Sequence, residues 1–209
     1  MTLAERLSHA RLYLVIDAGA AEGVVPAALE GGVDIVQLRE KSAPDDVVIE
    51  TGRAMRAPCD EHGALLIVND RPDLALACGA DGVHVGQDDL PLDEVRAIVG
   101  DELIVGTSTH TPEQVDAALA STADYLGVGP VYSTPTKPGR AAVGLDLVRY
   151  AAAHASAKPW FAIGGIDRSN LAAVAAAGAV RIAVVRAIRD ACDPRAAAGA
   201  FRLEEARVR

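Results

Sequence analysis

Residues 27–38 read AALEGGVDIVQL, and this short stretch decides the fold. An Ala/Leu run with helical character ends at a pair of glycines, and an apolar run follows at once. Glycine readily adopts the left-handed conformation just past a helix end, so the stretch predicts a helix, its cap and a buried strand. The same phrase recurs at residues 74–85 and 171–185. We therefore expect one helix-to-strand unit to repeat along the chain.

Eight apolar runs qualify as strands of this kind. They are short and continuous rather than alternating, which is typical of parallel strands covered on both faces. Helical windows separate them, and one opens at Thr111 with Pro112 and Gln114 in a capping-box arrangement. The expected strands are residues 12–16, 33–38, 64–68, 82–85, 103–106, 125–128, 160–163 and 181–185.

Eight strands alternating with helices in 209 residues predict an α/β protein, a (β/α)8 TIM barrel formed by one domain over residues 1–209. The alternative is an open, doubly wound sheet. That fold favours a G-x-G-x-x-G turn after its first strand, and residues 18–23 have the wrong glycine spacing. The barrel is therefore the preferred interpretation.

Charge and composition indicate which partners are disfavoured and in which cellular compartment we expect the protein. The formal charge of −9 disfavours nucleic acid or an anionic membrane as a partner, because both need a basic face. Glu5 and Arg6 interrupt the N-terminal region, and no apolar run approaches the ~20 residues of a membrane span. Cys59, Cys78 and Cys192 form no C-x-x-C pair, which favours reduced thiols over zinc or disulfides. We therefore expect a cytoplasmic protein. The sequence leaves its oligomeric state open, and a homo-oligomer is one of the possible states.

Polar residues gather just after the expected strands. In a (β/α)8 barrel the functional residues lie at the C-terminal strand ends, so these groups predict one shared site. The groups are residues 37–41, Asn69-Asp70, residues 87–89, residues 107–110, residues 133–137, Gly164-Gly165 and Arg186.

Two of these groups suit phosphate and metal. Arg39 and Lys41 leave a strand two residues apart, so both cations can point the same way toward a phosphate. Asp70 and Asp89 follow adjacent strands, where two carboxylates repel unless a cation joins them, and such hard oxygens suit Mg²⁺. Arg39 and Lys41 alone fit a solvated loop equally well, and either aspartate alone is better explained as a helix cap or turn residue. Together they favour a metal–phosphate site.

Other candidates carry weaker signals. Gly164-Gly165 allows an anion to approach the backbone closely, although a plain tight turn explains the pair as well. Ser108 has no base beside it, so we predict no nucleophilic triad. His84, within a strand, and His110, before a helix, are assigned no role.

Six ordered motifs resemble those of the thiamine phosphate synthase family, over residues 12–188 or nearly the whole chain. Any one of them is a weak signal, but six in the right order and spacing are a strong one. The motifs are Gln37-Leu38-Arg39-Glu40-Lys41, Val68-Asn69-Asp70, residues 82–89 (GVHVGQDD), residues 127–132 (GVGPVY), Thr134-Pro135-Thr136-Lys137 and Ile163-Gly164-Gly165-Ile166.

The resemblance implies a transferase that joins hydroxymethylpyrimidine diphosphate to hydroxyethylthiazole phosphate, with Mg²⁺ as cofactor. It implies that Asp70 and Asp89 bind the metal. The residues implied for the pyrimidine diphosphate are Gln37, Arg39, Lys41, Asn69, Ser108 and Lys137, with Leu38 and Glu40 in the same substrate-binding segment. Those implied for the thiazole phosphate are Thr134, Pro135, Thr136, Gly165, Val185 and Arg186.

The resemblance also implies a dissociative reaction, in which pyrophosphate leaves before the thiazole nitrogen attacks. The groups expected to act in catalysis are Arg39, Lys41, Ser108 and Lys137. The family usually has Ser where this chain has Arg186, and we expect Arg186 to contact the thiazole phosphate rather than point away. The rival functions are a thiazole tautomerase of the same fold and a binder without catalysis. The tautomerase is disfavoured because the diphosphate and metal residues occur together.

Overall fold

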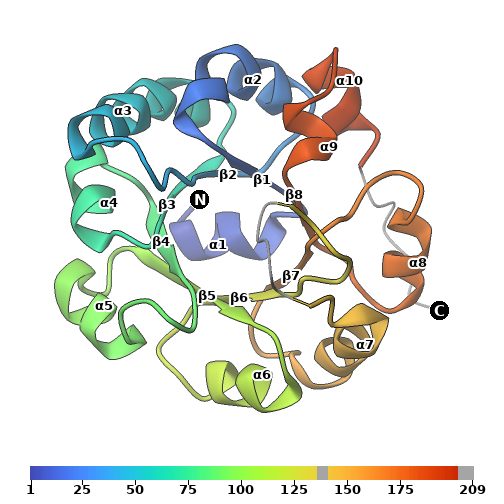
Figure 1. Ribbon diagram of the computed structural model, residues 1–209. Coiled ribbons are helices and arrows are strands. Elements are labelled where there is room, and N and C mark those ends of the chain that lie inside the picture. Colours follow the sequence, from blue (N-terminus) through green and yellow to red (C-terminus); the bar gives the residue numbers. More distant parts are fainter. Residues whose placement is uncertain (136–140, 202–209) are drawn as a thin grey trace.

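The structure, a computed structural model, describes residues 1–135 and 141–201. Eight parallel strands form a closed barrel, each pairing with the next and the last with the first. Apart from the first helix, which lies inside the ring of strands in this view, the helices surround the strands (Figure 1). The predicted (β/α)8 barrel is confirmed, and closure between the last and first strands rules out the open doubly wound sheet.

The elements follow the predicted alternation. The strands are β1 (Leu12–Ile16), β2 (Ile35–Leu38), β3 (Leu65–Asn69), β4 (Gly82–Val85), β5 (Ile104–Thr109), β6 (Tyr125–Val128), β7 (Trp160–Ile163) and β8 (Ile182–Val184). The helices are α1 (Leu3–His9), α2 (Ala18–Glu30), α3 (Asp45–Glu61), α4 (Pro72–Cys78), α5 (Leu92–Val99), α6 (Pro112–Leu119), α7 (Gly144–His154), α8 (Leu171–Ala176), α9 (Arg186–Arg189) and α10 (Pro194–Gly199). Within the described ranges, no helix is both long and apolar enough to cross a membrane.

Four strands differ in their bounds from the prediction: β2, β3 and β8 by one or two residues at an end, and β5 by three residues at its C-terminal end. The sequence predicts that the fifth strand ends at Gly106, whereas β5 continues to Thr109. Ser108 therefore belongs to the strand rather than to the loop after it. Polar residues end a predicted apolar run, but inside a barrel they can continue a strand when they face a polar cavity.

The recurring glycine phrase works as predicted. Gly32, Gly79 and Gly178 have positive φ angles of 96°, 67° and 103°. In each turn the residue after the glycine donates its amide to the carbonyl five positions earlier, at 2.9 to 3.3 Å. This is the Schellman arrangement, which satisfies a carbonyl at the helix end and directs the chain into the next strand.

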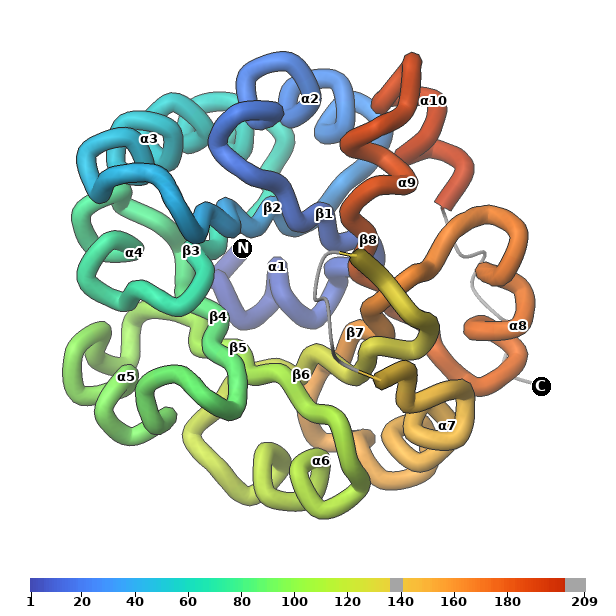
Figure 2. The backbone as a smooth tube through the Cα atoms, in the orientation of Figure 1, coloured from blue at the N-terminus to red at the C-terminus, as the bar shows by residue number. Residues whose placement is uncertain are grey.

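Two hydrophobic layers result from the strands. One lies between the strands and the helices, and the other fills the barrel, where Tyr13, Tyr125 and Phe161 supply aromatic rings. Leu7 of α1 belongs to the inner layer, and α1 lies within the ring of strands in Figure 2. Arg6 ties α1 to the segment before β3 by donating to two backbone carbonyls. Helix α1 thus covers the end of the barrel where the strands begin.

Aspartates tie neighbouring strands together at that end. Asp34, Asp81 and Asp124 stand before β2, β4 and β6, and each carboxylate accepts an amide of the preceding strand at 2.7 to 2.9 Å. Before β8 the corresponding residue is Arg181, which donates to the carbonyl of Ser8 at 2.8 Å. The same hydrogen bond between an aspartate and the preceding strand thus occurs three times, whereas the residue before β8 is bonded to α1.

Candidate functional site

A cavity of about 390 Å³ opens where the strands end, and all eight strands or the loops that follow them contribute to its wall. This is the face on which the barrel rule places function. The predicted site residues that line it are Gln37, Arg39, Asn69, Ser108, Thr134, Gly165, Val185 and Arg186.

The other predicted residues lie elsewhere. Leu38 is buried in the layer between strands and helices, facing Gly52 of α3 rather than the cavity. Pro135 is exposed and is not part of the wall. Thr136 and Lys137 lie outside the described residues.

Glu40 organises the loop after β2. One carboxylate oxygen accepts the amides of Ser42, Lys41 and Ala43 at 2.9, 2.8 and 3.3 Å. These hydrogen bonds, that of Ser42 above all, lower the pKa of Glu40 to about 2. A permanently charged Glu40 thereby fixes the backbone of Lys41, which carries one of the predicted cations.

Asp70 and Asp89 are brought together as expected. Burial raises the pKa of Asp70, the adjacent Asp89 carboxyl raises it further, and Lys41 opposes the shift from 3.6 Å. Asp70 has a φ of 62°, the only positive φ of a non-glycine residue within the described part of the chain. Such a conformation is uncommon and concentrates at functional sites. Asp89 is held in place by the amide of Gly86, which donates to its carboxylate at 2.7 Å.

The acidic pair fits a hard divalent cation. Neither carboxylate caps a helix, because the N-caps of α4 and α5 are Arg71 and Pro91. The repulsion between the two close carboxylates, which raises the pKa of Asp70, is relieved when a cation lies between them. In residues 1–135 and 141–201, His, Cys, Asp and Glu do not gather in threes that could hold a metal ion. Asp70 and Asp89 thus suit Mg²⁺, which keeps waters and takes further ligands from a phosphate.

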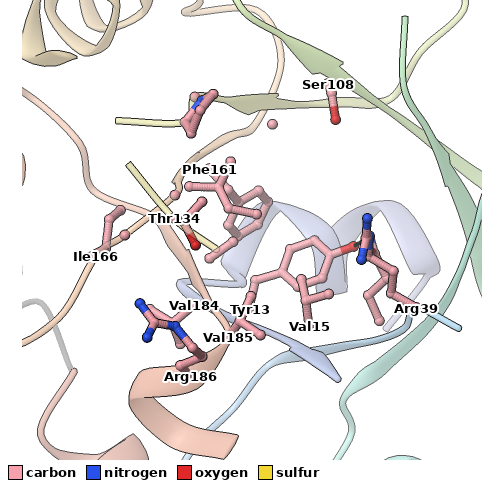
Figure 3. A pocket seen from close by; sticks show the side chains of 18 of the residues that line it. Tyr13, Val15, Arg39, Ser108, Thr134, Phe161, Ile166, Val184, Val185 and Arg186 are labelled. Carbon is pink, nitrogen blue, oxygen red and sulfur yellow. Dashed lines mark hydrogen bonds between the residues drawn. The ribbon is translucent and has the colours of Figure 1, made fainter. Parts of the chain in front are cut away.

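Cationic groups lie on opposite sides of the cavity. In Figure 3, Arg39 and Ser108 occupy one side and Arg186 the other, with Tyr13 and Phe161 between them. Two separated cations can each meet one anionic group, so the cavity has room for two charged ligands or for one with charge at both ends.

The two glycines after β7 form part of the second side. Gly164 and Gly165 have φ angles of 104° and 64°. A Cβ at Gly164 would lie 2.4 Å from Cβ of Pro130, and one at Gly165 would lie 2.8 Å from Cβ of Tyr132. The amides of Gly165 and Ile166 donate to no other residue that the structure describes. An anion can therefore approach these amides without obstruction by a side chain.

His110 lines the cavity at the start of α6. Thr111 caps that helix by accepting the amide of Gln114 at 3.3 Å, as the predicted motif requires. The Gln114 side chain returns to the amide of His110 at 2.8 Å, and the His110 ring contacts the carbonyl of Gly129. His110 thus joins the ends of β5 and β6 at the rim.

A buried polar chain was not predicted from the sequence. Gln37 donates to the hydroxyl of Tyr13 at 2.6 Å, and Tyr13 and Tyr125 share a hydrogen bond of 2.9 Å. His84 bridges Tyr125 at 3.0 Å and Ser108 at 2.9 Å. The available signal was a polar aromatic residue at inward positions of two otherwise aliphatic strands.

The comparisons with known proteins agree on one family. The family model described as "Thiamine monophosphate synthase" matches residues 12–188. A thiamine-phosphate synthase of Acidothermus cellulolyticus is 52% identical over 200 residues, 93% of this chain and 94% of that protein. One of Gloeobacter violaceus is 58% identical over 193 residues, 92% of this chain, which spans only 56% of that longer protein. The solved thiamine phosphate pyrophosphorylase of Pyrococcus furiosus has a TM-score of 0.83 and 34% identity, covering 96% of both chains.

Proposed function

Because the chain belongs to the thiamine monophosphate synthase family, we propose that it joins hydroxymethylpyrimidine diphosphate to hydroxyethylthiazole phosphate, forming thiamine phosphate and releasing pyrophosphate. The observation that carries this proposal is the division of one cavity into two sides that differ in chemistry. One side has Arg39 with the acidic pair nearby, and the other has glycine amides and Arg186.

The first side suits the pyrimidine diphosphate. Gln37, Asn69 and Ser108 offer hydrogen bonds to a polar ring, and Arg39 and Lys41 offer positive charge to the diphosphate. Lys137 is proposed to join them from the segment outside the described residues. Mg²⁺, held by Asp70 and Asp89, would neutralise charge on the diphosphate as it departs.

The second side suits the thiazole phosphate. The amides of Gly165 and Ile166 can donate to phosphate oxygens, and Arg186 brings a positive charge to the same wall, which Asp167 and Asp190 also line. Thr134 and Val185 line the remaining surface, and we include Pro135 and Thr136 of the same loop in the proposal.

The proposed reaction is dissociative. Pyrophosphate leaves first, and fixed cations such as Arg39 stabilise the charge that develops on it. The pyrimidine cation is then captured by the thiazole nitrogen, which needs no general base. Val15, Phe161 and Ile163 form an apolar wall that keeps competing water away from that cation. Holding both substrates in one cavity removes most of the entropic barrier to their meeting.

The tautomerase alternative is not supported. The relatives described above are synthases at 52% and 58% identity, and the acidic pair beside Lys41 serves no purpose in moving a proton within a thiazole. A binder without catalysis would need the same recognition groups, so turnover distinguishes it.

We further propose that residues 1–209 act as one catalytic domain in a reducing, cytoplasmic compartment. Cys59 and Cys78 are buried free thiols and Cys192 is an exposed one, which suits a reducing environment.

The decisive experiment mixes the purified protein with both phosphorylated heterocycles, with and without Mg²⁺. We expect thiamine phosphate and pyrophosphate in equal amounts, and loss of both when EDTA is added. Folded protein that interconverts thiazole tautomers without coupling would point to the isomerase. Retention of ligand without pyrophosphate release would point to the binder.

Arg186 can be tested separately. Arg186→Ser is expected to raise the KM for the thiazole phosphate about tenfold, equivalent to about 1.4 kcal/mol, while the KM for the pyrimidine diphosphate stays constant. Arg195→Ser is the matched control, since Arg195 is an exposed arginine of α10 paired with Glu30. An unchanged thiazole phosphate KM in Arg186→Ser would show that the arginine points away from that substrate.

A further inference from the structure

The buried polar chain crosses the barrel from β2 to β5 and ends at the cavity on both sides. All five of its members line the cavity, and Gln37 and Ser108 stand at its ends. Its middle members, Tyr13, Tyr125 and His84, come from β1, β6 and β4. All five side chains are buried, in an interior that otherwise consists mainly of aliphatic groups. A fully bonded chain in such surroundings is rigid, because a broken hydrogen bond would leave a polar atom unsatisfied.

The direction of the hydrogen bonds along the buried polar chain follows from which atoms carry a proton to donate. The hydroxyl of Tyr13 has two neighbours among the described residues, the amide nitrogen of Gln37 and the hydroxyl of Tyr125. Since the amide can only donate, both tyrosine hydroxyls are satisfied within the described residues when Tyr13 gives its own proton to Tyr125. If Tyr125 donated instead, the Tyr13 proton would have no acceptor in the described part of the chain.

The same count continues to the other end. Tyr125 accepts from Tyr13, so its proton goes to Nδ1 of His84. Neutral His84 then carries its proton on Nε2 and donates it to Oγ of Ser108. Burial raises the pKa of both tyrosines, so both hydroxyls keep their protons at any pH used for an assay.

We propose that Tyr13, Tyr125 and His84 are positioning residues, a one-way hydrogen-bond relay that presents the Ser108 hydroxyl to the cavity as a donor and the Gln37 carbonyl as an acceptor. Ser108, which accepts from His84, has its own proton available for the ligand. Gln37, whose nitrogen is engaged by Tyr13, has its oxygen available.

This pattern selects a kind of ring. A donor and an acceptor that face one cavity complement an aminopyrimidine, whose ring nitrogen accepts and whose amino group donates. An oxo-pyrimidine with a protonated ring nitrogen presents the opposite pattern and would be rejected, because buried polar groups would be left unpaired. The identity of the ring rests on the proposed function, whereas the direction of the relay does not.

The direction can be measured in the protein without substrate. Nitrogen-15 NMR of the imidazole rings, with the His84 signals identified from their loss in His84→Asn, should show the proton on Nε2 and none on Nδ1. Tyr125→Phe removes the donor to Nδ1, so both tautomers should become populated. A proton on Nδ1 in the wild-type protein would reverse the relay and overturn the proposal, whatever the activity of the protein.

Kinetics then test whether the relay acts on the substrate. Tyr125→Phe should raise the KM for the pyrimidine diphosphate about tenfold, with the KM for the thiazole phosphate unchanged. Tyr150→Phe is the matched control, because the Tyr150 hydroxyl bonds Asp116 at the surface between α7 and α6. If Tyr125→Phe does not fold, Tyr13→Phe interrupts the relay one link earlier and should act in the same direction.

A double-mutant cycle separates positioning from packing, since the Tyr125 ring also packs against Tyr13 and Phe161. If Tyr125 acts through Ser108, Tyr125→Phe should have little further effect on the pyrimidine diphosphate KM in a Ser108→Ala background. Equal, additive effects in both backgrounds would mean that Tyr125 only packs, and the proposal would fail while the synthase function stood. Absence of coupling activity with the Nε2 tautomer intact would instead remove the proposed function and leave the relay.

Discussion

At the scale of single residues, Asp70 concentrates several unfavourable features in one position. It has a left-handed backbone, a partly buried carboxyl and a second carboxyl beside it. Each feature lowers the stability of the unliganded protein, and each is explained if a cation occupies the position during the reaction. Lys41, whose side chain is more than half exposed, offsets only part of the repulsion.

Asp70→Asn should therefore separate stability from activity. Because the pKa of Asp70 is raised in the folded state, the folded protein holds this proton more tightly than the unfolded chain does. Stability then falls as pH rises from about 3.8 through the folded-state pKa, and the variant loses that slope. With EDTA at neutral pH the variant should melt higher, by about 2–4 °C for each kcal/mol of repulsion removed.

In the same variant, Mg²⁺-dependent turnover should fall by orders of magnitude. Added Mg²⁺ should not raise the melting temperature of the variant. The wild-type protein should gain about 2.7 kcal/mol at a Mg²⁺ concentration of 100 Kd. Calorimetry with EDTA and with Mg²⁺ measures both effects, and Asn tolerates the left-handed backbone. Asp93→Asn, an exposed change in α5, is the control. Wild-type activity in Asp70→Asn would remove Asp70 from the metal site.

The sequence located much of the candidate site but could not resolve which side chains face it. Arg39 and Asn69 line the cavity because they follow strands whose positions were clear from the apolar runs. Leu38 does not line the cavity. The strand that contains it lacks the alternation of polar and apolar residues that would show which side chains point into the barrel. The hydrogen bond between Tyr13 and Tyr125 joins positions 112 residues apart and exists only because the barrel closes.

At the scale of helices and strands, the aspartates before β2, β4 and β6 hold the barrel in register. Asp81 shows the device most fully. Its carboxylate accepts the amide of Leu66 at 2.7 Å and the Arg56 guanidinium at 2.8 Å, and Arg6 lies 3.6 Å from its other oxygen. One small acidic side chain thus joins α1, α3, β3 and β4.

Asp81→Ala should destabilise the protein by about 3 kcal/mol, because the buried amide of Leu66 loses its acceptor and the largely buried Arg56 guanidinium keeps only Asp60 as a partner. Asp146→Ala, which removes a 95% exposed partner of Arg149, should change stability by no more than about 0.5 kcal/mol. Urea unfolding of the two variants gives the comparison. Similar losses in both would show that the strand tie contributes nothing specific.

The glycine caps allow a graded test of the helix-to-strand turns. Gly79→Ala meets no atom within 4 Å, so it should lose about 1 kcal/mol from its left-handed backbone alone. Gly178→Ala also places its Cβ 2.5 Å from Cβ of Ala152, and about 3 kcal/mol is expected. Gly23→Ala, within α2 and in open space, should instead stabilise by about 0.5–1 kcal/mol. Thermal unfolding should find Gly23→Ala the most stable of the three variants, Gly79→Ala the next and Gly178→Ala the least stable.

The order of helices and strands was predictable because local signals agree with the tertiary structure. Glycine caps and apolar runs placed β1, β4, β6 and β7 with the bounds found in the structure. The end of β5 was wrong, since Thr107, Ser108 and Thr109 are polar residues buried in the barrel. Only the closed barrel provides partners for such residues, and no local pattern reveals them.

At the scale of the whole molecule, one end of the barrel contributes mainly to stability and the other holds the candidate site. Helix α1, the aspartate ties and the inner aliphatic residues lie toward the strand starts. The cavity, the acidic pair and the cations lie at the strand ends. Changes at the two ends should therefore have separable effects.

Leu7→Ala tests that division, because Leu7 is a buried residue of α1 in the inner layer. The substitution should cost about 3 kcal/mol of unfolding free energy by leaving a cavity. The KM values for both substrates should stay unchanged at a temperature where the variant is folded. Urea unfolding and steady-state kinetics on one preparation measure both quantities. A large rise in either KM would show that α1 communicates with the cavity.

Helix α1 also affects how ligands reach the cavity. Because α1 and the inner layer fill the end of the barrel where the strands begin, the cavity opens at the other end, where the strands end. The helix that stabilises the strand starts thus also decides the route of ligands, which enter and leave at the strand ends.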